Sequence, residues 1–300
     1  MTDTTTPSLD AIARPSGAFA MVAMDQRESL RAMFDLAGAG RPADDVLIRF
    51  KLDVAAALGP IASGFLIDNQ YGFGEVRDQK LLPSSAGLIL AADALEQEDG
   101  GPVEETGLDE VVIGPDTDLT GVSALKLLII WRRDDRREQR VELAKRFIER
   151  SAELGLLSVL EPVVRATQGE LDAGTWDLDD AIVEAAEELS PLRPSLYKAQ
   201  VPMLGAGDDE TQRAASERLA AAITGPWVVL SQGVERERFL SAVEAACRAG
   251  ASGFLAGRAL WSDVVGADDV PSKLNELSVP RLEQLVAVVD RSARPWKEAL

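Results

Sequence analysis

Two lysines interrupt apolar runs of the sequence, where a charged side chain is unexpected. Lys126 lies within the run 125–130, and Lys198 lies within the run 196–201. Burying an ammonium group is costly unless it is paired or neutralised, so one such lysine is best explained as a strand-edge residue that reaches water. Two of them, with Glu161 ending the apolar run that lies between them, favour a functional site.

Lysine amines beside a carboxylate are suited to amine catalysis. A desolvated lysine next to another cation is partly neutral near pH 7, and it can attack a ketone to form a Schiff base. The iminium withdraws electrons and stabilises a carbanion at the next carbon, which permits cleavage of the adjoining carbon–carbon bond. A carboxylate must then move the proton of the hydroxyl that becomes the aldehyde, and Glu161 and Asp25 are available for this step.

The composition excludes several other kinds of site. The 300 residues include no histidine and one cysteine, which excludes Ser-His-Asp and Cys-His catalysis, His-ligated metals, zinc fingers, cysteine-ligated clusters and disulfides. A net charge of −19 argues against nucleic-acid and anionic-membrane partners. We find no signal peptide and no membrane-spanning run. We therefore expect a cytoplasmic protein whose chemistry needs no metal and no cofactor.

The elements that must position these residues form a repeating pattern. Eight short apolar runs are typical of buried strands, at residues 17–24, 63–67, 87–91, 122–131, 156–160, 195–201, 227–230 and 252–256. Helical patterns separate most of them, for example at 45–58, 137–154, 179–189, 210–223 and 236–249. This alternation indicates a parallel sheet covered on its outside. We predict an α/β fold, a single-domain (β/α)8 TIM barrel over residues 16–300, after a loose tail at residues 1–15.

Two local features bear on this fold. A doubly wound sheet is the alternative, but it would need a glycine-rich turn after the first strand, where Asp25-Gln26-Arg27 stands instead. Residues 94–119 interrupt the repeat and contain nine acidic residues. We expect a solvated surface loop there, with a lid or a partner-binding loop as the alternative, because long loops on compact domains are often functional.

Catalytic residues of a barrel lie where the strands end at its C-terminal face. The residues at or near these ends that could contact a ligand are Asp25, Asp68, Lys126, Glu161, Lys198, Ser231, Gln232, Gly233, Gly257 and Arg258. The turns at 231–233 and 257–258 predict an anion site, because loops after the seventh and eighth strands often bind phosphate. An arginine there would add a charge-assisted contact. Taken singly, each turn could also be an ordinary link between strand and helix.

Six segments resemble the class I aldolases of the tagatose-bisphosphate and sulfofructose-phosphate group. They are residues 17–28, 124–132, 160–165, 196–198, 227–231 and 251–259, and the resemblance extends over roughly 14–295. Within this group the chain is more similar to the sulfofructose phosphate aldolases, through residues 126–132, 161–165 and 261–266. The resemblance implies a homo-oligomer that cleaves 6-deoxy-6-sulfofructose 1-phosphate to dihydroxyacetone phosphate and sulfolactaldehyde, a step in sulfoquinovose degradation.

The resemblance also implies roles for individual residues. Lys198 would be the Schiff-base lysine and Glu161 the general acid and base. Lys126 would be the cation that favours the neutral amine of Lys198, and Asp25 would orient the substrate hydroxyls. The phosphate would be held by Ser231, Gly233, Gly257 and Arg258, and the residues near the sulfonate would be Gln26 and Arg27.

Two positions depart from the pattern of these relatives. Relatives often carry Val-Glu after the Schiff-base lysine, where this chain has Ala199-Gln200, and a small residue is usual in place of Gln232. Other functions therefore stay open. They are the same chemistry on tagatose or fructose bisphosphate, a non-catalytic barrel that binds a sugar phosphate and uses residues 94–119 to contact a partner, and an isomerase or epimerase.

Overall fold

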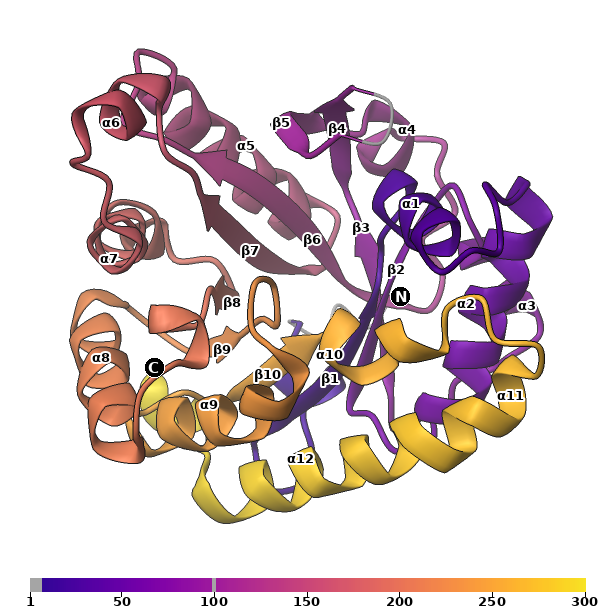
Figure 1. Cartoon of the computed structure of the whole chain (residues 1–300). Helices are drawn as coiled ribbons and strands as arrows, with labels where there is room; N and C mark the ends of the chain where they lie inside the picture. The colour runs from indigo at the N-terminus through magenta and orange to yellow at the C-terminus, as the bar shows by residue number, and fades with distance from the viewer. Residues whose placement is uncertain (1–6, 99–100) are drawn as a thin grey trace.

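Eight parallel strands close into a barrel in the computed structural model, which describes residues 7–98 and 101–300 (Figure 1). Their order around the barrel is β1-β10-β9-β8-β7-β6-β3-β2. The strands are β1 (Phe19–Met24), β2 (Gly64–Asp68), β3 (Gly87–Ala91), β6 (Val122–Trp131), β7 (Leu157–Val164), β8 (Leu196–Ala199), β9 (Trp227–Val229) and β10 (Gly253–Ala256). Each of the eight predicted strands is present, which confirms the (β/α)8 barrel.

Helices cover the outside of the barrel, as Figure 1 shows for α2, α5, α7, α8, α9 and α12. Their apolar faces pack on the outward side chains of the strands in one large core, which includes Phe65, Trp131 and Tyr197. The helices are α1 (Glu28–Leu36), α2 (Asp44–Leu58), α3 (Phe73–Asp78), α4 (Glu110–Ile113), α5 (Arg137–Glu153), α6 (Gln168–Ala173), α7 (Leu178–Leu189), α8 (Asp209–Ala222), α9 (Arg236–Arg248), α10 (Arg258–Trp261), α11 (Val270–Lys273) and α12 (Val279–Ser292). One π-helical turn, Leu274–Ser278, joins α11 to α12.

The N-terminal end of the barrel is closed by residues from both ends of the described chain. Leu9 and Ile12, around the 3-10 turn Leu9–Ala11, bury their side chains with Trp296 against the inward residues of the strands. A side chain at Gly87 would lie 2.2 Å from the carbonyl oxygen of Ala11, so this turn packs tightly on β3. The expected loose tail is therefore wrong for residues 9–12, because these apolar side chains fill the barrel base. Residues 1–6 lie outside the described residues.

The acidic segment after β3 is folded rather than a solvated loop. It contains an antiparallel hairpin, β4 (Asp93–Gln97) with β5 (Val103–Leu108), and the short helix α4. The base of the hairpin is tied to the barrel, because the Ala92 amide donates to the Lys126 carbonyl at 2.8 Å. Inward residues of the hairpin face the open end of the barrel. The expectation of a surface loop was therefore wrong here, although residues 99–100 lie outside the described residues.

No helix in the described ranges is both long enough and apolar enough to span a membrane.

Closure of the barrel depends on a glycine where β10 meets β1. Gly253 has φ +139°, and a side chain there would lie 1.9 Å from the carbonyl oxygen of Phe19, its partner across the ladder. We expect Gly253→Ala to lower the free energy of unfolding by about 2–4 kcal/mol, because it combines backbone strain with a collision between strands. Urea denaturation measures this change.

The matched control is Gly169→Ala, since a methyl group at Gly169 of α6 would meet nothing within 4 Å. This substitution should leave the free energy of unfolding unchanged or slightly raised, because alanine favours the helix. Equal effects of the two substitutions would contradict the role of Gly253 in closing the barrel.

Candidate active site

A cavity of about 230 Å³ opens at the C-terminal ends of the barrel strands. It is lined by the predicted site residues Asp25, Gln26, Arg27, Lys126, Glu161, Lys198, Ser231, Gly257 and Arg258. Gly233 is not in the lining, and Asp68 lies behind it. Five basic side chains line the cavity against four acidic ones, in a chain whose net charge is −19. The cavity is thus a local excess of positive charge on an acidic protein, as an anionic ligand would require.

Lys126 and Lys198 share one carboxylate oxygen of Glu161. The Nζ atom of each lysine lies 2.9 Å from Glu161 Oε2, and all three side chains are buried. The topology causes this arrangement, because Glu161 stands on β7, between Lys126 on β6 and Lys198 on β8. Strand alternation turns Lys198 into the barrel and its neighbour Tyr197 toward the helices.

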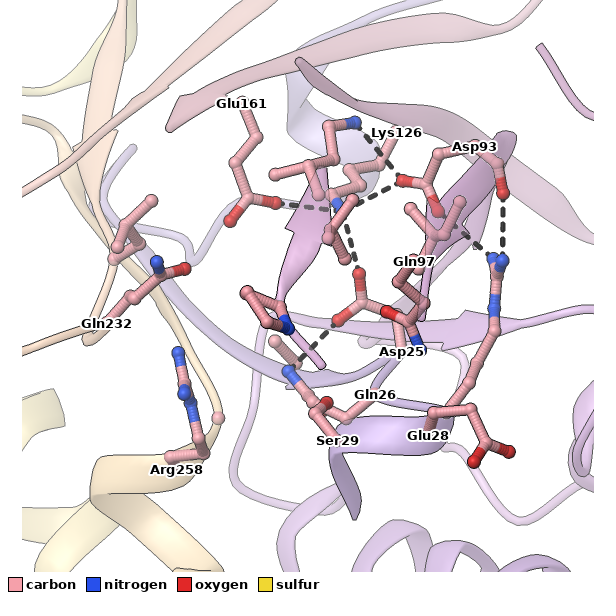
Figure 2. A pocket seen from close by; sticks show the side chains of 18 of the residues that line it. Asp25, Gln26, Glu28, Ser29, Asp93, Gln97, Lys126, Glu161, Gln232 and Arg258 are labelled. Atoms are coloured by element: carbon pink, nitrogen blue, oxygen red, sulfur yellow. Dashed lines mark hydrogen bonds and ion pairs between the residues drawn. The ribbon is translucent and has the colours of Figure 1, made fainter. Parts of the chain in front are cut away.

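Asp25 provides a second carboxylate for Lys126. Its Oδ2 atom accepts from Lys126 Nζ at 2.8 Å, and its Oδ1 atom accepts from the Gln26 amide at 3.3 Å (Figure 2). Burial alone would raise the pKa of Asp25, but the charges of Lys126 and Lys198 outweigh burial and hold it well below its usual range. Asp25 is therefore a carboxylate at any pH near neutrality, which suits an acceptor for hydroxyl protons.

Asp93, at the start of the hairpin, joins the lysine cluster to Arg27. Its Oδ2 atom accepts from Lys126 Nζ at 2.9 Å and from the Leu128 amide at 3.1 Å. Its Oδ1 and carbonyl oxygens accept from the Arg27 guanidinium at 3.0 and 2.9 Å. Burial would lower the pKa of Lys126, but Asp25, Asp93 and Glu161 raise it well above its usual value. Lys126 is thus a permanent cation beside Lys198.

A buried ion pair supports Arg27 from behind the cavity. Lys51 of α2 pairs with Asp68 at the end of β2, and both side chains are fully buried. Asp68 Oδ1 also accepts from the amides of Gln70 and Tyr71, and it lies 3.9 Å from Arg27 Nε. Burial raises the pKa of Asp68 and lowers that of Lys51, each against the attraction of its partner. Asp68 was predicted at the site, and the structure assigns it to this supporting layer.

Arg258 faces the cavity from the other side, beside Gln232 (Figure 2). In the part of the chain described by the structure, its guanidinium has no ion pair and no hydrogen-bond partner. Burial lowers the pKa of Arg258, although Glu161 and Asp25 oppose this shift. Gly257 permits the approach of this turn to β1, because a side chain there would lie 2.5 Å from the Ala23 carbonyl oxygen. An unpaired, half-buried arginine beside a close backbone turn suits an anionic ligand.

Comparison with known proteins identifies the family. Residues 19–263 match the model of the DeoC/LacD family aldolases. The chain belongs to this family. It is 28% identical to tagatose 1,6-diphosphate aldolase of Listeria monocytogenes serotype 4a (strain HCC23), over 96% of this chain and 92% of the relative. It is 25% identical to tagatose 1,6-diphosphate aldolase 2 of Streptococcus agalactiae serotype III (strain NEM316), over 97% and 96% of the two chains.

Solved structures support the fold of this aldolase. Fructose-bisphosphate aldolase from Plasmodium falciparum superposes with a TM-score of 0.66 at 14% identity, over 97% of this chain and 94% of that one. An archaeal fructose-1,6-bisphosphate aldolase, with its catalytic lysine bound to a carbinolamine intermediate, gives 0.56 at 16% identity, over 94% and 98%. At this identity the likeness concerns the barrel alone.

The two departures noted in the sequence have different surroundings in the aldolase. Gln200 accepts a hydrogen bond from the Val164 amide at 2.7 Å, so its side chain ties the end of β8 to β7. Gln232 instead lines the cavity next to Arg258, in the turn expected to hold an anion.

Three charged residues that line the cavity were not among the predicted site residues: Glu28, Asp93 and Arg165. Asp93 comes two positions after the end of the strand Gly87–Ala91, and its place just beyond a buried strand was the signal that could have found it. Arg165 follows Val164 at the end of β7 and also lines the cavity. It falls in a segment that carried the family resemblance, but spacing alone assigned it no role.

Removing the charge of Asp93 tests the buried cluster. We expect Asp93→Asn to lower the free energy of unfolding by about 2–4 kcal/mol, because Lys126 and Arg27 lose a buried partner. Urea denaturation measures this loss. The control Glu235→Gln removes an exposed ion pair with Arg238 and should cost under about 0.5 kcal/mol. A similar small loss for both substitutions would show that the cluster does not depend on Asp93.

Proposed function

We propose that this aldolase cleaves 6-deoxy-6-sulfofructose 1-phosphate to dihydroxyacetone phosphate and sulfolactaldehyde through a Schiff base on Lys198. One observation carries the proposal: Lys198 Nζ lies 2.9 Å from Glu161 Oε2, which it shares with the permanently charged Lys126. A nucleophilic amine, a proton carrier and a neighbouring cation are the parts that this reaction needs. They lie together in a buried pocket on three adjacent strands.

The geometry supports a definite order of steps. Lys198 passes a proton to Glu161 and attacks the ketone carbon, and the resulting carbinolamine loses water with a proton returned by Glu161. The iminium then accepts the electron pair of the carbon–carbon bond as Glu161 or Asp25 takes the proton of the adjacent hydroxyl. The aldehyde leaves, the enamine is protonated at carbon, and water hydrolyses the new iminium to release dihydroxyacetone phosphate.

The phosphate contacts of this proposal lie beside Lys198 in the barrel. Ser231 and Arg258 stand at the ends of β9 and β10, and both line the cavity with Gly257. Gly233 contributes the turn, with φ +78°, rather than the cavity wall. Gln26 has a buried amide oxygen with no partner and stays a proposed substrate contact.

Three alternatives compete with this proposal: another substrate, a non-catalytic sensor and an isomerase. The relatives named above are tagatose 1,6-diphosphate aldolases, so the same reaction on a bisphosphate is the nearest alternative. A sulfonate and a phosphate are both tetrahedral oxyanions, and the sulfonate is preferred here because of the motifs at 126–132, 161–165 and 261–266. A sugar-phosphate sensor without catalysis, or an isomerase, would use the same pocket without a covalent lysine. The homo-oligomeric state stays a prediction.

Borohydride trapping tests the Schiff base. With dihydroxyacetone phosphate and borohydride, we expect one covalent adduct, which peptide mass spectrometry places on Lys198, because reduction fixes the iminium. Lys198→Met should give no adduct. Lys145→Met, which removes an exposed lysine of α5, should be trapped like the unchanged protein. Binding of the ligand without any adduct at Lys198 would overturn the Schiff-base mechanism and favour the sensor or the isomerase.

A side-by-side kinetic comparison tests the substrate. We expect kcat/KM for 6-deoxy-6-sulfofructose 1-phosphate to exceed the values for tagatose 1,6-bisphosphate and fructose 1,6-bisphosphate by about 10-fold or more. One well-placed contact that discriminates between the two end groups, about 1.4 kcal/mol, is enough for that ratio. A higher kcat/KM for either bisphosphate would contradict the proposed sulfosugar substrate, but it would not contradict the aldolase reaction.

A further inference from the structure

Arg165 presents a second unpaired guanidinium at the mouth of the cavity. It follows β7 in the row Glu161, Val163, Arg165, whose members point to the same side of the strand. Its amide donates to the Trp131 carbonyl at 2.9 Å, which fixes its backbone to the end of β6. Its side chain lines the cavity together with Leu128 and Leu230.

The charge of Arg165 has no counter-ion among the residues that the structure describes. Its Nε atom is buried and has no hydrogen-bond partner. The carboxylate whose charge acts on Arg165, Glu104, forms an ion pair with Arg132 at 2.5 Å instead. Burial lowers the pKa of Arg165, yet a guanidinium stays charged near neutral pH. An uncompensated, partly desolvated charge is costly, so a ligand anion is the partner that would stabilise it.

Arg165 and Arg258 lie on opposite sides of the reactive lysine. The barrel order β10-β9-β8-β7 places Arg258 two strands from Lys198 in one direction and Arg165 one strand away in the other. A substrate bonded to Lys198 through its ketone, with its phosphate at Arg258, therefore directs its far end toward β7.

The height of Arg165 above the reaction centre also fits a distal group. Arg165 lies four positions beyond Glu161, which is about 13 Å along an extended strand. Val163 lies between them on the same side of β7, in register with Ile130 of β6, and these two side chains cluster with Leu230. Arg165 thus faces a group that projects beyond the bond to be cleaved rather than the reacting atoms.

The other arginine in reach is already neutralised. Arg27 donates to the carboxylate and the carbonyl of Asp93 and lies close to Asp68. We therefore infer that Arg165, rather than Arg27, binds the anionic group on the end of the ketose that leaves as the aldehyde. The inference rests on the proposed Schiff-base reaction. The group it fits is a tetrahedral oxyanion, and the substrate comparison above separates sulfonate from phosphate.

The test compares a substrate that has a distal anion with one that lacks it. On 6-deoxy-6-sulfofructose 1-phosphate, or on the bisphosphate if that is the better substrate, Arg165→Gln should lower kcat/KM by about 30-fold or more, through the loss of charge-assisted hydrogen bonds. On fructose 1-phosphate, whose far end is a hydroxyl, the loss should be under about 3-fold. Arg165→Lys should retain more activity on the charged substrate than Arg165→Gln does. Lysine keeps the positive charge but lacks the planar guanidinium that can donate two parallel hydrogen bonds.

Two further variants serve as controls for this comparison. Arg258→Gln should lower kcat/KM on both substrates and weaken trapping by dihydroxyacetone phosphate. Arg133→Gln removes an arginine that pairs with Glu170 and Glu184 outside the cavity, so it should leave the ratio between the substrates unchanged. Equal losses on both substrates in Arg165→Gln would overturn the inference. Absence of an adduct at Lys198 in the unchanged protein would instead overturn the proposed function.

Discussion

The structure depends on the burial of Lys126 among three carboxylates at the mouth of the barrel. A lone ammonium group there would be prohibitively unstable, and Asp25, Asp93 and Glu161 compensate it from β1, the hairpin and β7. Parallel strands fix these side chains, because the backbone ladder sets their height and their spacing together. Lys198 then meets Glu161 in a site whose charges are already balanced, so little reorganisation is needed when charge moves during the reaction.

Charge is distributed unevenly over the molecule. The chain as a whole carries −19, yet the cavity contains more basic than acidic side chains. The acidic surface keeps the molecule in solution and repels anions in general, while the field inside the cavity attracts them. Within the cavity the arginines divide into a neutralised one, Arg27, and two with open guanidinium groups, Arg165 and Arg258. A ligand anion is therefore stabilised more by Arg165 and Arg258 than by Arg27, whose charge is already compensated by Asp93.

Much of the barrel could be predicted from the sequence, because each buried parallel strand is a short apolar run that ends in polar residues. Lys198 and Glu161 were predictable for the same reason, since a charge inside such a run needs an explanation. The hairpin was not, because β4 and β5 are short, mostly exposed or half-buried, and contain acidic residues in place of an apolar run. The partners of Asp93 could not be predicted either, since Arg27 is 66 residues away along the chain. Leu9 and Ile12 were misjudged because the tail offered too few apolar residues to indicate a buried turn.

The β4–β5 hairpin makes part of the cavity wall structurally separable from its floor. It leaves the barrel at Ala92, whose amide bonds to the Lys126 carbonyl, and it returns through Asp109, whose amide bonds to the Ala92 carbonyl. Apart from Asp93, which pairs with Lys126, the hairpin beyond these bonds contributes side chains such as Leu95, Gln97 and Val103 to the wall without entering the barrel ladder. Mutations that lengthen or reshape the hairpin can therefore accumulate while the strands that hold the lysines keep their register. Changes in the hairpin can therefore alter which substrates the cavity admits, while the lysines and carboxylates on the barrel strands stay in place.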